Sequence, residues 1–287
     1  MTMTASKPVT TPATTPVTTP AVPLFGRLLL TGAAGGLGQV LRPRLKAHCA
    51  VLRLSDIAEL GSAAPGEELV PAPLEDKAAV LALLEGVDAV VHLGGVSTEH
   101  SFEEVLPANI TGVFHLYEAA RKQGVRRIVF ASSNHAIGFY TQDQVIDTRA
   151  SPRPDGYYGL SKAFGENLAQ LYWDRHGIET VSLRIGSSFP EPKDRRMLCS
   201  WLSFDDLERL VLAALTAPRV GHSIVYGVSD NRQVWWDNSQ AAHIGFRPQD
   251  SSEPFRAAVE ARQPPRAADD PTLVYQGGAY TALGPFD

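Results

Sequence analysis

Apolar runs alternate with helical patterns along most of the chain. Continuous apolar runs are typical of strands buried on both faces of a parallel sheet, and they predict strands over Leu24–Thr31, Ala50–Leu54, Val87–Leu93, Arg127–Ala131 and Thr180–Ile185. Apolar residues at helical spacing predict helices between these runs, over Gly38–Ala47, Ala78–Leu84, Pro107–Gln123 and Tyr158–His176. Alternating strands and helices imply right-handed parallel crossovers. We therefore expect an α/β fold with a doubly wound parallel sheet.

The first 23 residues depart from this pattern. They read MTMTASKPVTTPATTPVTTPAVP, which contains no apolar run long enough for a signal peptide or a membrane span. Proline lacks a backbone donor and threonine offers little apolar surface, so we expect a disordered tail over residues 1–23. Residues 24–287 are predicted to form a single domain, with substrate-binding elements mainly from a small C-terminal portion, residues 186–287.

Composition limits the possible partners. Hydrophobic residues make up 44% and charged residues 20% of the chain, as in globular proteins. The formal net charge is −5 and the basic residues are scattered, so we expect neither a nucleic-acid nor a membrane partner. Cys49 and Cys199 lie in no disulfide or zinc pattern, and the histidines show no metal-binding spacing. We expect no metal and a cytoplasmic setting.

A glycine-rich turn joins the first predicted strand to the first helix. It reads TGAAGGLG, with glycines at GxxGxxG spacing. Gly32 permits a tight turn, Gly35 lets the backbone approach a pyrophosphate, and Gly38 allows close helix packing. Glycines also cluster in ordinary turns, but this position between strand and helix favours a Rossmann-type dinucleotide site. The expected contacts are Gly32, Ala34, Gly35, Gly36, Leu37 and Gly38.

An aspartate follows the second predicted strand. Asp56 lies where a carboxylate can bind the adenosine ribose hydroxyls and repel a 2′-phosphate, which favours NAD over NADP. Arg53 could soften this preference, although strand alternation points its side chain away from Asp56. A turn or helix-capping role is the alternative reading of this aspartate.

A Tyr-x-x-x-Lys pair opens the predicted helix Tyr158–His176. Tyr158 and Lys162 share one helix face, so the ammonium can stabilise a phenolate that acts as a base. Together with Ser133 at a strand end and the glycine turn, the pair resembles the extended branch of the short-chain dehydrogenase/reductase superfamily. The resemblance implies that Ser133 polarises the substrate, Tyr158 is the acid/base, Lys162 also holds the nicotinamide ribose, and Asn109 positions a proton-relay water.

Further motifs narrow the resemblance to the uronate dehydrogenases. They are FASSNHAIG at 130–138, RPDG at 153–156, LRIGS at 183–187, RML at 196–198 followed by Trp201, WWDNS at 235–239 and QGG at 276–278. The likeness runs from about Leu24 to the C-terminus. It implies NAD-dependent oxidation of D-glucuronate or D-galacturonate at C1 to an aldarolactone, within a homo-oligomer. The implied substrate contacts are Ser97, Ser133, Asn134, His135, Tyr158, Ser187 and Arg196.

The same resemblance implies further contacts to NAD. Leu93, Gly94 and Gly95 are similar to the small-residue loop beneath the adenosine and pyrophosphate. Tyr158, Lys162 and Ile185 complete the implied set. Where the family tends to have Asp-Leu against the adenine, this chain has Ala72-Pro73-Leu74, so we expect Leu74 to contact the adenine through its backbone.

A uronate substrate requires a cation for its carboxylate. Arginine binds a carboxylate bidentately, which makes Arg196 the candidate. Its competitors are Lys193 and Arg195, and a solvated basic loop is the alternative for all three. His135 either donates to the substrate or is structural. We expect the pair Trp235–Trp236 to close the core or a subunit contact rather than bind sugar.

Two other functions stay open at this point. A sugar-nucleotide epimerase or dehydratase would use the same glycine turn and the same Tyr158 and Lys162, but it must also enclose a nucleotide diphosphate. Only about 100 residues follow the strand ending at Ile185, which is short for that task. A non-catalytic NAD-sensing protein is the second alternative, and the intact Tyr-Lys pair argues against it.

Overall fold

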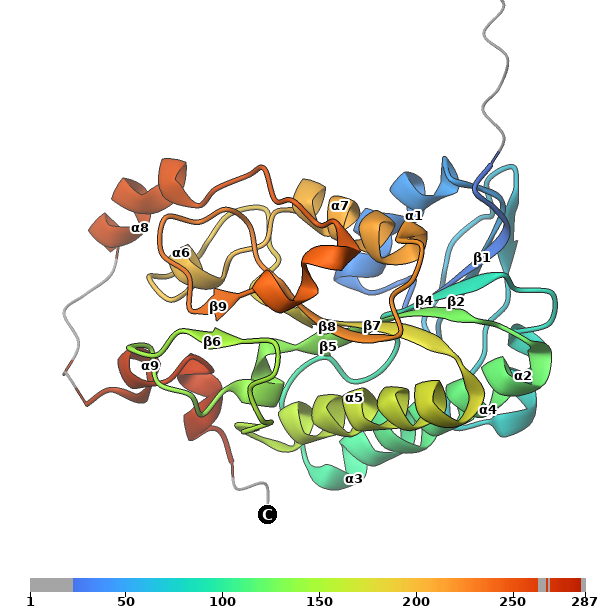
Figure 1. Ribbon diagram of the computed structural model, residues 1–287, viewed down its shortest axis with the longest axis horizontal. Coiled ribbons are helices and arrows are strands. Elements are labelled where there is room, and N and C mark those ends of the chain that lie inside the picture. The colour runs from blue at the N-terminus through green and yellow to red at the C-terminus, as the bar shows by residue number, and fades with distance from the viewer. Residues whose placement is uncertain (1–22, 263–266, 268, 285–287) are drawn as a thin grey trace, which may run out of the picture.

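The predicted strands lie side by side in a parallel sheet. This computed structural model (Figure 1) describes residues 23–262, 267 and 269–284. The main sheet of the described part has seven strands in the order β3-β2-β1-β4-β5-β7-β8. The strands are β1 Phe25–Thr31, β2 Cys49–Ser55, β3 Glu67–Leu69, β4 Ala89–His92, β5 Arg127–Ser133, β7 Glu179–Ile185 and β8 His222–Gly227. A separate parallel pair joins β6 Ile146–Asp147 to β9 Trp236–Asp237.

Helices cover both faces of the sheet. In Figure 1, α1 and α7 lie on one side and α4 and α5 lie on the other. Each side has its own cluster of buried aliphatic residues, because the strands are apolar on both faces. The helices are α1 Gly36–Lys46, α2 Lys77–Leu83, α3 Phe102–Val105, α4 Val113–Gln123, α5 Tyr157–His176, α6 Met197–Ser200, α7 Phe204–Thr216, α8 Arg256–Arg262 and α9 Pro271–Val274. The expected doubly wound α/β fold is confirmed.

The strand order reverses at β1. The chain runs from β1 outward to β2 and β3 on one side, then returns to place β4 on the other side of β1. The loops that follow β1 and β4 therefore lead away from each other at the carboxyl edge of the sheet. In open α/β sheets ligands bind in the crevice at such a position.

The helix predicted over Pro107–Gln123 is divided. The chain forms the short helix α3, a π-helical stretch over Leu106–Gly112, and then α4. Ser101 and Glu104 form a capping box that starts α3 earlier than the apolar spacing predicted. Single π-helical turns occur frequently at functional sites, and this one carries Asn109.

The edge strand β3 was not predicted. It has three residues, none of them in an alternating apolar pattern. It is held by parallel pairing with β2 and by ion pairs: Arg42 binds Glu67 at 2.6 Å, and Arg27 binds Glu68 at 2.9 Å. Backbone pairing and charged side chains give no hydrophobic signal in the sequence.

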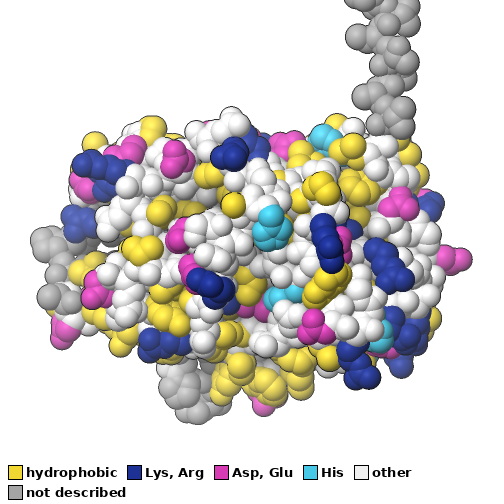
Figure 2. All heavy atoms as spheres, viewed as in Figure 1, with side chains coloured by type: hydrophobic (Ala, Val, Ile, Leu, Met, Phe, Trp, Pro, Cys, Tyr) yellow, Lys and Arg dark blue, Asp and Glu magenta, His cyan; other side chains and the backbone are white. Residues whose placement is uncertain are grey.

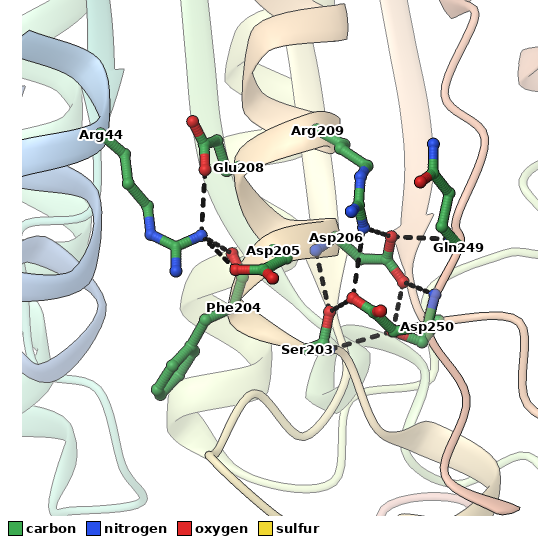
Figure 3. Close-up of polar contacts among 10 residues, drawn as sticks. Arg44, Ser203, Phe204, Asp205, Asp206, Glu208, Arg209, Gln249 and Asp250 are labelled. Atoms are coloured by element: carbon green, nitrogen blue, oxygen red, sulfur yellow. Dashed lines mark hydrogen bonds and ion pairs between the residues drawn. The ribbon is translucent and has the colours of Figure 1, made fainter. Parts of the chain in front are cut away.

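The segment after β8 is tied back to α7 through Asp206. This buried carboxylate accepts hydrogen bonds from Arg209 at 2.6 Å, the Ser229 hydroxyl at 2.7 Å, and the backbone N–H groups of Gln249 at 2.8 Å and Asp250 at 3.0 Å. Figure 3 shows Arg209, Gln249 and Asp250 gathered around Asp206 beside the N-terminus of α7. One carboxylate thus fixes two remote stretches of the C-terminal region to the sheet-covering helix.

Some predictions fall beyond what the structure describes. The predicted tail of residues 1–23 lies, except for Pro23, outside the described residues. The single-domain reading of residues 24–287 stays a prediction. No described helix has the length and apolar character needed to cross a membrane.

Candidate active site

The glycine-rich turn has the geometry of an anion cradle. Gly32 has φ +69°, and a Cβ there would lie 2.6 Å from the carbonyl carbon of Leu93. A Cβ on Gly38 would collide with the backbone of Gly32 and Ala33. No side chain caps the N-terminus of α1, so its first N–H groups remain available to a phosphate. The turn therefore fits the pyrophosphate of a dinucleotide.

Asp56 lies beside this turn. Its carboxylate accepts hydrogen bonds from the backbone N–H of Ala34 and of Ala58, each at 3.0 Å. These bonds fix the carboxylate at the adenosine side of the turn, so a turn-stabilising role and a ribose-binding role are compatible. The side chain of Arg53 points away from Asp56, as strand alternation predicted. Its Nε donates to the carboxylate of Glu68 at 2.8 Å.

The ends of β1 and β4 are joined below the crevice. The hydroxyl of Thr31 contacts Nδ1 of His92 at 2.7 Å and accepts from the N–H of Gly94 at 3.3 Å. Burial lowers the pKa of His92 to about 3, with a smaller contribution from Lys162 in the same direction. His92 is therefore a neutral structural bridge between the glycine turn and the loop that follows β4.

The loop after β4 packs closely on its surroundings. Gly94 and Gly112 face Leu74, and a Cβ at Gly112 would come within 2.5 Å of the Leu74 Cβ. The Leu74 carbonyl contacts Nδ1 of His115 at 3.1 Å, so this backbone oxygen already has a partner within the protein. Ser97 lies farther along the loop and is exposed.

Asn109 is committed to hydrogen bonds within the protein. Its Oδ1 accepts from the N–H of Val96 at 2.7 Å, and its Nδ2 donates to the Val96 carbonyl at 2.9 Å and to the Ser161 hydroxyl at 3.0 Å. The Ser161 hydroxyl donates in turn to the carbonyl of Tyr158 at 2.7 Å. The side chain of Asn109 therefore links the loop after β4 to the helix that carries Tyr158.

Tyr158 and Lys162 lie together in the first turns of α5, as the spacing predicted. The Lys162 ammonium is 5.5 Å from the centre of the Tyr158 ring and 5.3 Å from that of Phe130. Burial raises the pKa of Tyr158 to about 12, and the Ser133 hydroxyl opposes this shift. Burial also lowers the pKa of Lys162 to about 8. The pair is held in a dry environment that strengthens any charge interaction within it.

The two serines at the end of β5 have separate partners. Ser132 donates to Glu166 at 2.6 Å, and Glu166 forms a fully buried ion pair with Arg184 at 2.8 Å. Ser133 accepts the N–H of His135 at 3.2 Å and is adjacent to Tyr158. Of the two serines, only Ser133 therefore faces Tyr158.

Arg196 is held by three neutral acceptors. Nε donates to the Gln276 carbonyl at 2.6 Å and Nη1 to the Ser187 hydroxyl at 3.3 Å. With the amide of Asn134 oriented to satisfy both its neighbours, Nη2 donates to its oxygen at 2.6 Å and its nitrogen donates to the Ile185 carbonyl at 3.1 Å. Burial lowers the pKa of Arg196. Of the five N–H donors of a guanidinium, these bonds leave one on each terminal nitrogen.

The two competing cations, Lys193 and Arg195, do not share the hydrogen-bond partners of Arg196. Arg195 is exposed, and the Lys193 ammonium lies 3.8 Å from the centre of the Phe189 ring. Within the described residues, no carboxylate lies within 4.0 Å of the Arg196 guanidinium. Arg196 is thus a half-buried cation beside Ser187 and Asn134, and two of its N–H donors have no partner among the bonds described above.

His135 is ordered by two neighbours that the sequence did not single out. Its Nδ1 lies 2.7 Å from the buried carboxylate of Asp155, and its ring stacks on Tyr280 with centroids 3.8 Å apart. Burial lowers the pKa of His135, and the Asp155 carboxylate opposes that effect. The centroids of the His135 and Tyr158 rings lie 5.9 Å apart in an edge-type arrangement, so His135 belongs to the site as well as to the packing around it.

Gln276 is another residue that sequence reasoning missed. Besides holding Arg196 through its carbonyl, its side chain accepts from Nε1 of Trp236 at 2.8 Å and donates to the Thr141 and Gln144 carbonyls, each at 3.0 Å. Trp235 and Trp236 are buried in the adjoining apolar cluster, which agrees with their expected role in the core. The only signal for Gln276 was its place in the QGG motif.

Glu99 was also not predicted. This carboxylate is buried, with 8% exposure, and binds the N–H groups of Tyr157 and Tyr158 at 2.7 and 2.9 Å. A single acidic residue in a loop carries no signal of such a contact in the sequence. Glu99 therefore caps the N-terminus of α5, the helix that carries Tyr158.

Comparisons with known proteins agree with this geometry. A model of the NAD dependent epimerase/dehydratase family matches residues 28–203. The uronate dehydrogenase of Pseudomonas putida is 67% identical over 264 residues, which cover 92% of this chain and 98% of that protein.

Solved structures give the same result. The glucuronic acid dehydrogenase of Chromohalobacter salexigens is 51% identical with a TM-score of 0.89, covering 90% of this chain and 97% of that one. A tyrosine-to-alanine mutant of the Agrobacterium tumefaciens uronate dehydrogenase, complexed with NAD, is 47% identical with a TM-score of 0.88, covering 91% and 98%. The chain therefore belongs to the NAD dependent epimerase/dehydratase family and, within it, to the uronate dehydrogenases.

Proposed function

We propose that this protein is an NAD-dependent dehydrogenase that oxidises D-glucuronate, D-galacturonate or both at C1 to the aldarolactone. The observation that carries the proposal is the hydrogen bonding of the Arg196 guanidinium. A half-buried guanidinium with only neutral partners and one free N–H on each terminal nitrogen suits bidentate binding of a carboxylate. Ser133, Tyr158 and Lys162 lie in the same crevice and supply the acid/base group.

The residues divide the reaction between them. Arg196, assisted by Ser187 and Asn134, binds the substrate carboxylate and so sets which end of the sugar reaches the base. Ser133 donates to the C1 oxygen while the Tyr158 phenolate removes the C1 hydroxyl proton. The C1–O single bond becomes the lactone carbonyl as the C1 hydrogen leaves with its electron pair. NAD, when bound, supplies the acceptor for that hydride.

Lys162 supports the base electrostatically. At neutral pH it is mainly protonated, since its pKa is about 8, and its charge favours the phenolate of Tyr158 over the neutral phenol. In this dry site the effect of one cation is larger than it would be in water. Asn109 acts at a distance by fixing the loop after β4 to α5.

The cofactor site is assigned to the residues around the crevice. The glycine turn from Gly32 to Gly38 and the N-terminus of α1 would hold the pyrophosphate, and Asp56 would bind the adenosine ribose. Gly94, Gly95 and Leu93 would lie beneath the adenosine, with Leu74 at the adenine and Ile185 near the nicotinamide end. A carboxylate at the ribose favours NAD over NADP.

The proposal is tested by NAD reduction with D-glucuronate and D-galacturonate against D-glucose and D-galactose, for the wild type and two variants. Arg196→Ala should lose on the order of 100-fold or more in kcat/KM with uronates and little with neutral sugars. Arg195→Ala, the exposed neighbour, is the matched control and should behave as the wild type. Wild-type protein without uronate activity, or equal losses on acidic and neutral sugars, would refute the proposal.

The sugar-nucleotide epimerase alternative has less support. Curated uronate dehydrogenases match at 48–67% identity over most of the chain. An epimerase returns the hydride to its substrate, so it would release no net NADH during the same assay. Accumulation of NADH in proportion to uronate consumed separates the two functions.

We also propose that the protein forms a homo-oligomer through the face of α3, α4 and α5. Several large apolar side chains are exposed there: Phe102, Leu106, Phe114, Tyr157, Leu160 and Leu171. Figure 2 shows hydrophobic side chains gathered at the lower edge of the molecule, where Figure 1 places α3. A patch of this kind marks an interaction surface. Light scattering should give a multiple of the 31.0 kDa chain mass, and Leu160→Glu should reduce it.

A cytoplasmic location is proposed on the cysteines. Cys49 and Cys199 are both free and buried, as expected for a protein that matures in a reducing compartment. Fractionation of the producing cells, with NADH-forming activity as the marker, tests this location.

A further inference from the structure

The loop after β4 is fastened at one end by Asn109. As described above, the Asn109 amide binds both backbone groups of Val96 and reaches Ser161 on α5. A Cβ on Gly95, which has φ +128°, would lie 2.5 Å from the Asn109 Oδ1. This end of the loop therefore has one position relative to α5.

The other end is fastened by Glu99. Each of its carboxylate oxygens accepts one backbone N–H, from Tyr157 at 2.7 Å and from Tyr158 at 2.9 Å. A Cβ on Gly156 would collide with this carboxylate, so the residue before the helix must be glycine for the contact to form. Within the described residues no Lys, Arg or His forms an ion pair with Glu99. Its charge is compensated by the N–H groups and the positive end of the α5 dipole.

Ser97 and Thr98 are the only residues between these two fastened points. Ser97 is an implied substrate contact, and Tyr158 is the proposed base. Glu99 contacts the backbone of Tyr158 directly, and it lies two residues from Ser97. The hydrogen bonds therefore place a substrate-binding hydroxyl and the base in one rigid unit.

We propose that Glu99 is a positioning residue for the reaction: its carboxylate holds the Ser97 loop against the first turn of α5, so that Ser97 and Tyr158 keep a fixed separation around the sugar. This inference rests on the proposed uronate oxidation. Displacement of a reacting group by about 1 Å can cost on the order of 100-fold in rate. The contacts of Glu99 with the N–H groups of Tyr157 and Tyr158, which we call the clamp, therefore affect catalysis as well as stability.

A purely stabilising helix cap is the competing explanation, and the chain offers a matched control for it. Glu179 also accepts two consecutive backbone N–H groups from a remote segment, those of Val220 at 2.9 Å and Gly221 at 3.0 Å. Glu179 is the first residue of β7, so it lies at the amino edge of the sheet, opposite the carboxyl edge where the cofactor is proposed to bind. Removing either contact should destabilise the fold, but only Glu99 contacts the catalytic helix.

The experiment compares Glu99→Gln, Glu99→Ala and Glu179→Gln with the wild type. Activity with D-glucuronate is normalised to NAD-binding sites counted by titration, which removes losses from unfolded protein. Both Glu99 variants should lose between about 10- and 100-fold in kcat/KM, divided between a higher uronate KM and a lower kcat. NAD affinity should stay within about twofold, well below the tenfold of a 1.4 kcal/mol change. Glu179→Gln should lower the thermal midpoint and leave both kinetic constants near those of the wild type.

A double variant tests whether Glu99 acts through Ser97. If the clamp positions Ser97, Ser97→Ala combined with Glu99→Ala should lose clearly less than the product of the two single losses. Fully multiplicative losses, normalised kinetics of Glu99→Ala within about twofold of the wild type, or an equal kinetic loss in Glu179→Gln would each overturn the proposal.

Hydrogen exchange provides a readout that is independent of turnover. The amide hydrogens of Tyr157 and Tyr158 should exchange on the order of tenfold or more faster in Glu99→Ala, because each loses a bond to a charged acceptor. Unchanged exchange at these two amides would overturn the clamp even if the wild type oxidised no uronate. Wild-type inactivity together with faster exchange would refute the proposed function and leave the clamp itself intact.

Discussion

The carboxylate of Asp155 accepts a hydrogen bond from Nδ1 of His135 over 2.7 Å. An ionised carboxylate can only accept, so Nδ1 carries the hydrogen and Nε2 of the neutral ring presents a lone pair. The Asp155 side chain has no exposure, and its second oxygen, Oδ1, has no hydrogen-bond partner in the described chain. Asp155 therefore determines which hydrogen-bonding group His135 offers to a ligand.

Loss of this control should reduce substrate recognition. Asp155→Asn weakens the hold on Nδ1 and removes a charge, so we expect kcat/KM with uronates to fall at least about tenfold, with NAD affinity retained. Steady-state kinetics and NAD titration measure the two effects. Asp174→Asn, an exposed substitution on α5, serves as the control. An unchanged kcat/KM in Asp155→Asn would contradict the tautomer-setting role.

The hydroxyl of Tyr158 is expected to be indispensable for turnover. Tyr158→Phe removes the base and should lower kcat on the order of 1,000-fold or more, while NAD binding stays nearly intact. Stopped-flow NADH formation and a fluorescence titration with NAD provide the measurements. Tyr172→Phe removes a hydroxyl at the far end of the same helix and should leave kcat close to that of the wild type. Retained turnover in Tyr158→Phe would remove the base assignment.

The pH dependence of kcat/KM should follow the Tyr158 and Lys162 pair. Tyr158 acts as a base only when deprotonated, and burial raises its pKa to about 12, with Ser133 opposing and Tyr280 and Asp155 adding to the shift. Activity should therefore rise with pH through the neutral range. Lys162→Met removes the cation that favours the phenolate and should move the rising limb to higher pH. If kcat/KM rose over the same pH range in both proteins, Lys162 would have no effect on the pKa of the Tyr158 hydroxyl.

His92 should make the fold acid-sensitive. Its pKa is lowered from 6.5 to about 3, so between these values the unfolded chain binds a proton that the folded protein does not. Stability is therefore lost as pH falls below the unfolded pKa. By linkage, His92 alone costs about 2 kcal/mol between pH 7 and about pH 5.

Urea unfolding of the wild type and His92→Gln at both pH values isolates this cost. The variant lacks the titrating ring and should lose about 2 kcal/mol less than the wild type on acidification. A parallel loss of stability in the two proteins would show that His92 does not titrate as described.

The local features of the fold were predictable from sequence. Buried parallel strands show as apolar runs, and the glycine turn and the Tyr158–Lys162 pair are defined by spacing within one element. The edge strand β3 was not predicted because arginine–glutamate pairs, which give no hydrophobic pattern, help to hold it. The π-helical turn within Pro107–Gln123 was not predicted because the spacing of apolar residues does not reveal the backbone hydrogen bonding.

The supporting contacts of the site were not predictable in the same way. Glu99 binds N–H groups 58 and 59 residues away in sequence, and the carbonyl that holds Arg196 is 80 residues from it. A backbone carbonyl carries no residue-type signal, and a lone carboxylate fits many roles. The sequence already favoured Arg196 over Lys193 and Arg195, but its partners, the Gln276 carbonyl among them, were visible only in the tertiary structure.

The Gln276 carbonyl that orients Arg196 has a consequence for how the protein becomes active. All strands of the main sheet precede Gln276 in the chain. During synthesis, the glycine turn that is proposed to bind the dinucleotide is therefore complete well before Arg196 can make its hydrogen bond to the Gln276 carbonyl. A chain shortened before Gln276 would keep the glycine turn and the Tyr158–Lys162 pair, but the Arg196 guanidinium would lose the acceptor of its Nε and keep only the contacts of its terminal nitrogens. Proteolysis at that point should therefore weaken the recognition of an acidic sugar more than the binding of the dinucleotide.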